Sequence, residues 1–246
     1  MGKTSTIDAR SLTLIAKRVQ EQTGGCLTLE QAAQTVAETL FDELGGRAVL
    51  ARVFATVPFG ELPASNRTFV RDLAATNDIV SLIKDDTLIL SLLGTRGVKP
   101  EWNDRHTSQG HVGIPLASAS FVEQIPMISR LLKQVGLDLD WIDSDDTDIV
   151  TRSISGISGV FYVQDAAQAV DHQGRKIIPA QDFVAAQDVQ TVFGLAVGYP
   201  ASKRFVAIIV FCRETLAKEE VERFSPLIDA FKANTDSLVL SGSFFD

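Results

Sequence analysis

Cysteine is nearly absent from this sequence: the 246 residues contain only Cys26 and Cys212. A small secreted fold held together by disulfides uses several cysteines at close spacing, so this chain is not of that kind. Two thiols this far apart also provide no Cys-x-x-Cys motif for redox chemistry. They are typical of a protein that folds in a reducing compartment, and we expect a cytoplasmic location.

Long apolar runs are also missing. The longest such stretch, residues 205–212, is far shorter than the ~20 residues that a helix needs to cross a bilayer, and we interpret it as a buried strand. Residues 1–8 are polar, and no apolar stretch typical of a secretory signal follows them. We therefore expect neither a membrane span nor export.

The chain lacks an excess of positive charge. It has 23 Lys and Arg against 31 Asp and Glu, which gives a net charge of −8. Because nucleic-acid binding depends on neutralising phosphates, we expect no nucleic-acid partner. Part of the acidity is six aspartates within residues 138–148, which lack the Gly and the Glu of a calcium-binding loop. We interpret residues 137–148 as a solvated acidic linker.

The sequence does contain a clear succession of amphipathic helices and β-branched strands. Helical spacing predicts helices over 7–22, 28–44 (capped by Thr28), 66–75, 78–84, 118–135 (with a kink or break at Pro126), 177–186 and 216–238. Alternating apolar residues predict strands over 47–57, 87–93, 112–116, 159–164, 191–199 and 204–213. In the first strand, Val49, Val53 and Val57 are expected on one face, and Leu50 and Phe54 on the other.

The last two strands are separated only by a turn at residues 200–203, which predicts a β-hairpin. Turn chemistry is also predicted over 94–100. Strands and helices alternate irregularly, so an α+β fold is favoured over a doubly wound parallel sheet. A chain of this length can bury enough surface to fold without a disulfide or a structural metal.

The order of these elements resembles that of a GAF domain. The segments that carry the resemblance best are TVFGLAVGY at 191–199, RFVAIIVFC at 204–212, and TLAKEEVERF at 215–224, where a helix begins after the hairpin. A typical GAF domain is shorter. The resemblance therefore implies a lead-in helix within residues 1–25 and a single GAF-like domain over 26–241, with an insertion around 58–155.

The resemblance implies a GAF- or PAS-like central antiparallel β-sheet flanked by helices, with long helices at both ends. Signalling helices would cover one face of the sheet and a small-molecule pocket would lie on the other. The implied function is a non-enzymatic sensor for signal transduction that binds a ligand and forms a homodimer through its terminal helices. Two alternatives stay open: a dimerisation or interaction module without a ligand, and a haem- or tetrapyrrole-binding sensor. Covalent bilin attachment is not supported, because Cys212 has no adjacent His.

The first candidate ligand site is a polar segment inside the expected insertion. It brings together two of the three histidines, an aromatic ring, a carboxylate, an amide and a guanidinium, in Trp102, Asn103, Asp104, Arg105, His106 and His111. Such groups suit a bound anion or heterocycle, by charge, stacking and proton exchange. The alternative is a hydrogen-bonded loop that pins the insertion to the sheet. The spacing of the two histidines matches no zinc motif, so we expect no metal site.

The second candidate site lies between the strands expected at 159–164 and 191–199. Its polar residues are Tyr162, Asp165, Arg175, Gln181 and Asp182. In GAF domains this stretch supplies pocket walls and lid segments, so the resemblance implies a role in ligand binding. Arg175 offers a positive charge to an anion. Ordinary turn chemistry at a strand end explains the same residues equally well.

Overall fold

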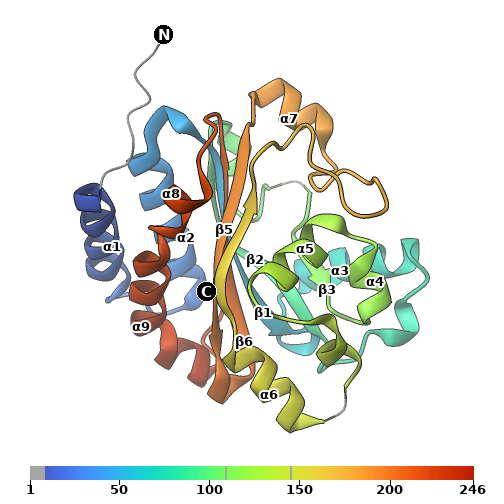
Figure 1. Ribbon diagram of the computed structural model, residues 1–246. Helices are drawn as coiled ribbons and strands as arrows, with labels where there is room; N and C mark the ends of the chain where they lie inside the picture. Colours follow the sequence, from blue (N-terminus) through green and yellow to red (C-terminus); the bar gives the residue numbers. More distant parts are fainter. Residues whose placement is uncertain (1–8, 109, 145) are drawn as a thin grey trace.

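A six-stranded antiparallel β-sheet separates two layers of helices (Figure 1). The computed structural model describes residues 9–108, 110–144 and 146–246. The strand order is β3-β2-β1-β6-β5-β4. The strands are β1 (Ala48–Pro58), β2 (Leu88–Gly97), β3 (Gly113–Pro115), β4 (Ser158–Val163), β5 (Thr191–Tyr199) and β6 (Arg204–Cys212). The predicted α+β class, with a central antiparallel sheet flanked by helices, is confirmed.

One face of the sheet is covered by helices from the two ends of the chain (Figure 1): α1 (Ala9–Thr23), α2 (Leu29–Leu44), α8 (Lys218–Glu222) and α9 (Ser225–Ser241). The middle of the chain forms the other layer: α3 (Ala64–Thr76), α4 (Ala119–Glu123), α5 (Pro126–Gln134), α6 (Thr147–Ser155) and α7 (Gln181–Gln187). Short 3-10 helices lie at Gly45–Arg47, Phe59–Glu61, Val80–Leu82, Pro100–Trp102, Leu139–Asp143 and Pro200–Ser202. None of the helices in the described ranges is both long enough and apolar enough to span a membrane.

Local signals explain several helix ends. The Thr28 hydroxyl accepts a hydrogen bond from the Gln31 amide at 3.2 Å and caps α2, as predicted. Pro126 is in the first turn of α5 and separates it from α4, because proline cannot donate the helical hydrogen bond. The helix predicted over 216–238 is also divided, into α8 and α9, and Pro226 lies in the first turn of α9. The prediction of one continuous helix there was wrong.

The turn predicted from Gly94 onward is also wrong, since β2 continues to Gly97. A Cβ atom on Gly94 would lie 2.3 Å from the carbonyl carbon of Ala33 in α2. Glycine is therefore needed at this position because α2 crosses β2 in backbone contact, and it does not mark a chain reversal.

Residues 137–148 are not a solvated linker. Leu137, Leu139 and Trp141 are buried in the core between the sheet and the middle layer. Asp146 caps α6 by accepting hydrogen bonds from backbone amides of its first turn. The apolar residues hold this segment to the core, and its exposed side chains include Asp138, Asp140, Asp143, Asp146 and Asp148. The helix predicted over 78–84 shortens to the 3-10 turn Val80–Leu82.

The faces of β1 determine where a cavity forms. Val53 and Val57 pack under the terminal helices, whereas Leu50 and Phe54 point toward the middle layer, as predicted. Val49 also packs on the Leu50 side, contrary to prediction, because the register with β6 shifts between Ala48 and Leu50.

Candidate functional site

A cavity of about 480 Å³ lies between the central strands and the middle layer. Its floor is made by alternate residues of β1 and β6, in which Leu50 pairs with Phe211 and Arg52 with Ile209. The described residues that line it are Leu50, Arg52, Phe54, Trp102, Gly110, His111, Ile114, Met127, Ile128, Ile178, Pro179, Ala180, Phe183, Ile209 and Phe211. This volume and this mainly apolar lining are typical of small-molecule sites.

Three aromatic rings form one wall of the cavity. Trp102 meets Phe183 of α7 edge-on, with ring centroids 5.5 Å apart. Phe183 in turn meets Phe211 of β6 edge-on at 5.4 Å. Edge-to-face contacts of this kind favour a fixed ring arrangement, so the wall presents a defined surface to a flat apolar group.

Arg52 is the charged residue of the cavity floor. It lies between Leu50 and Phe54 on the same face of β1, and its Nη2 donates a hydrogen bond to Ser108 Oγ at 2.8 Å. Burial lowers the pKa of Arg52 to about 10, because a charged guanidinium loses hydration there. The side chain therefore still carries a positive charge at neutral pH.

His111 lies at the cavity beside Gly110. Burial and the positive charge of Arg52 lower its pKa below the usual value of 6.5. The imidazole is therefore neutral at pH 7 and offers one nitrogen as a donor and the other as an acceptor. Of the eleven predicted site residues, Trp102 and His111 line the cavity.

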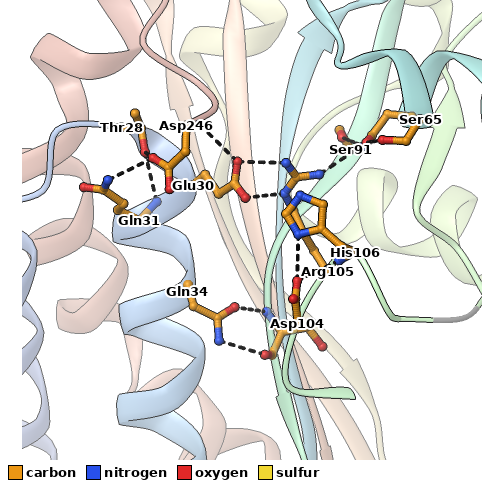
Figure 2. A network of polar contacts seen from close by, with 12 residues as sticks. Thr28, Glu30, Gln31, Gln34, Ser65, Ser91, Asp104, Arg105, His106 and Asp246 are labelled. Carbon is orange, nitrogen blue, oxygen red and sulfur yellow. Dashed lines mark hydrogen bonds and ion pairs between the residues drawn. The ribbon is translucent and has the colours of Figure 1, made fainter. Parts of the chain in front are cut away.

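Arg105 does not face the cavity. Its guanidinium forms a two-bond ion pair with Glu30 of α2, with Nε to Oε1 at 2.5 Å and Nη2 to Oε2 at 2.9 Å (Figure 2). Nη1 donates a third bond to Asn66 Oδ1 at 3.2 Å. Only 6% of the Arg105 side chain is exposed. Arg105, which we expected to bind an anionic ligand, is thus paired with a carboxylate from the helices on the other face of the sheet.

The neighbours of Arg105 also bind their own chain. Asn103 Oδ1 accepts a hydrogen bond from the Gly97 amide at 3.0 Å, and the Asn103 carbonyl accepts one from Gln34 of α2 at 3.2 Å. Asp104 accepts bonds from the backbone and the ring of His106, and these bonds lower the pKa of Asp104. This half of the segment forms a hydrogen-bonded loop tied to β2 and α2, in line with the alternative of a hydrogen-bonded loop considered from the sequence.

Residues 243–246 extend the contact around Glu30. The amides of Leu29 and Glu30 donate to the carbonyls of Ser243 and Phe244, at 2.8 and 2.9 Å. Asp246 accepts hydrogen bonds from Thr28 and Gln31 at the first turn of α2 (Figure 2). The sequence offered no signal for this cluster, because its members come from segments far apart in the chain.

None of the residues of the second candidate site lines the cavity. Tyr162 donates its hydroxyl to the Leu216 carbonyl at 2.5 Å, and Asp165 accepts bonds from two amides of the following turn. Gln181 donates to two backbone carbonyls, and Asp182 is exposed on α7. Arg175 pairs with Asp171 and lines a separate hollow of about 310 Å³.

Arg52 is the candidate site residue that the sequence analysis missed. The available signal was a single charged residue in the mainly apolar stretch AVLARVFATV at residues 48–57. A charge in the middle of a buried strand needs a local reason, and a cavity supplies it. In the part of the chain that the structure describes, no three His, Cys, Asp or Glu side chains are grouped to hold a metal ion.

No protein-family model and no curated protein matches the chain. It is similar to the solved GAF domain of a phosphoenolpyruvate-protein phosphotransferase from Coxiella burnetii, at 12% identity and a TM-score of 0.48, over 96% of this chain and 99% of that one. The phycocyanobilin-bound GAF domain of a cyanobacterial phytochrome shows 10% identity and a TM-score of 0.49, over 94% and 96%. A phycoerythrobilin-bound GAF domain of a cyanobacterial phytochrome shows 12% and 0.45, over 95% and 96%. All three are GAF domains, the family that the sequence resembles.

Proposed function

We propose that this chain is a sensor domain that binds a small, mainly apolar molecule in the cavity between β1, β6 and the middle layer. The observation that supports the proposal is the cavity itself. Protein interiors are close-packed and contain few voids larger than a water molecule. A space of about 480 Å³ walled by Trp102, Phe183 and Phe211 is therefore better explained as a ligand site than as imperfect packing.

The lining favours binding over catalysis. Its ionisable side chains are Arg52 and His111, and no Ser, Thr, Cys, Lys, Asp or Glu is among the lining residues described. A general base without a nucleophile, a metal or a second acid–base group has no complete reaction to perform. Arg52 and His111 serve as orienting groups for a bound molecule.

A route from the cavity to the terminal helices supports a signalling role. The segment from Trp102 to His111 contributes to the cavity wall at both ends. Between these ends, Asn103 and Arg105 are bonded to Gln34 and Glu30 of α2. A ligand that moves the wall therefore also acts on α2.

Blocking the cavity tests the proposal. The neutral fluorophore N-phenyl-1-naphthylamine, whose emission rises in apolar surroundings, is the probe. Ala180→Trp fills the rim of the cavity, and Ala185→Trp places the same side chain on an exposed position of α7 outside the lining. We expect saturable binding to the wild type and to Ala185→Trp, with at least about tenfold weaker binding to Ala180→Trp. Equal binding to all three proteins, or none to the wild type, would contradict the proposal.

A further inference from the structure

The charge of the cavity indicates what kind of molecule it takes. Arg52 is flanked by Leu50 and Phe54 along β1 and is paired with Ile209 on β6. Its guanidinium extends to the segment that closes the cavity, because a Cβ on Gly110 would lie 3.9 Å from Nη1. The positive charge thus lies at the cavity, between its floor on β1 and the lining residue Gly110.

The described lining of the cavity contains no acidic side chain to offset this charge. None of the fifteen described lining residues is Asp or Glu. The Ser108 hydroxyl, which accepts a hydrogen bond from Arg52 Nη2, is neutral. In surroundings of low polarity, a positive charge attracts an anion more strongly than it does in water and repels a cation. The cavity therefore selects against cationic molecules.

His111 does not change the net charge of the cavity lining at neutral pH. Its pKa is lowered by burial and by Arg52, so it adds no second positive charge. Apart from Arg52, the lining is mainly apolar, and the rings of Trp102, Phe183 and Phe211 form one of its walls. The site thus combines one cationic point with a large surface for rings.

We infer that the ligand is an acid that has a flat apolar body and one anionic group, with the anion on Arg52 and the body against the wall of Trp102, Phe183 and Phe211. The inference rests on the proposed ligand cavity and specifies its substrate class. A guanidinium fork matches the two oxygens of a carboxylate or a sulfonate, and a charge-assisted pair of this kind is stronger than a neutral hydrogen bond.

Two probes with the same ring system test this inference. 1-Anilinonaphthalene-8-sulfonate is N-phenyl-1-naphthylamine with one added sulfonate, so the pair differs only by the anionic group. In fluorescence titrations of the wild type, we expect the sulfonate to bind about tenfold more tightly than the neutral probe. Arg52→Met is expected to abolish this preference and to change binding of the neutral probe by less than about threefold. Ala180→Trp is expected to weaken the binding of both probes.

Arg96→Met is the matched control. Arg96 lies on β2 in the same sheet, but it packs over Phe41 of α2 on the opposite face. This variant is expected to retain the preference for the sulfonate. Thermal melts establish that each variant is folded. If Arg52→Met does not fold, competition of 2-naphthoate against 2-naphthamide on the wild type provides the same comparison without a substitution.

The outcomes separate the two proposals. If both probes bind the wild type equally, if naphthamide competes as well as naphthoate, or if the preference survives in Arg52→Met, the ligand is not an acid held by Arg52, while the cavity remains a binding site. If neither probe binds the wild type, the proposed function itself fails.

Discussion

Breaking the ion pair between Glu30 and Arg105 should destabilise the protein strongly. The pair joins α2 to the 102–111 segment, and the two side chains are 11% and 6% exposed. Glu30→Gln preserves the shape of the side chain but leaves the Arg105 guanidinium charged, buried and facing an amide. Removing one partner of a buried pair typically costs 3–5 kcal/mol, so we expect a loss of about 3 kcal/mol in the free energy of unfolding.

Urea denaturation followed by circular dichroism measures this loss. For a chain of this size, 3 kcal/mol corresponds to a fall of roughly 6–12 °C in the melting temperature. The matched control is Glu43→Gln, which removes the carboxylate partner of Arg18 in a pair whose arginine is 57% exposed. Exposed pairs contribute about 0–1 kcal/mol, so the control should behave nearly as the wild type.

The double variant Glu30→Gln with Arg105→Met tests whether the lost stability comes from the interaction between these two side chains. Once Arg105 no longer carries a charge, the glutamine faces no buried cation, and the double variant should be more stable than Glu30→Gln alone. A Glu30→Gln loss below about 1 kcal/mol, together with additive effects in the cycle, would refute the role assigned to this pair.

Three further predictions concern Gly94, His111 and the oligomeric state. Gly94→Ala should prevent stable folding or soluble expression, since the added Cβ would meet the Ala33 backbone at 2.3 Å, whereas Gly46→Ala, with open space around it, should cost less than about 1 kcal/mol in urea titrations. For His111, the lowered folded pKa means that the unfolded chain binds a proton first as the pH falls through 6.5. The wild type should therefore lose stability between pH 8 and pH 5.5 relative to His111→Gln, and equal pH dependence of the two unfolding midpoints would contradict the assignment. The homodimer expected from the resemblance stays a prediction: sedimentation velocity should give twice the monomer mass, and Leu14→Glu, at an exposed position of α1, should give the monomer.

The parts of the fold that local chemistry determines could be predicted from the sequence. Thr28 caps α2 and Pro126 breaks a helix through groups within a few residues of each, and the closing hairpin follows from two alternating strands around a short turn. Gly94 was misinterpreted because its partner, Ala33, lies in another helix. The aspartates between 138 and 148 led to the prediction of a solvated linker, although apolar residues between them, such as Trp141, are buried.

The candidate site was predicted only in part, for the same reason. Trp102 and His111 do line the cavity, but Arg105, in the same segment, is taken by Glu30 from 75 residues away. No local sequence pattern distinguishes an arginine that binds a ligand from one that forms an ion pair within the protein. Arg52 could have been found, since a charge within a buried strand is itself a signal.

The most direct test of the central claim is a crystal structure of the protein grown with 1-anilinonaphthalene-8-sulfonate. We predict that the rings lie in the cavity against Phe183 and Phe211, with the sulfonate bonded to Arg52. A probe bound only elsewhere on the surface, with the cavity filled by the protein's own side chains, would contradict the account.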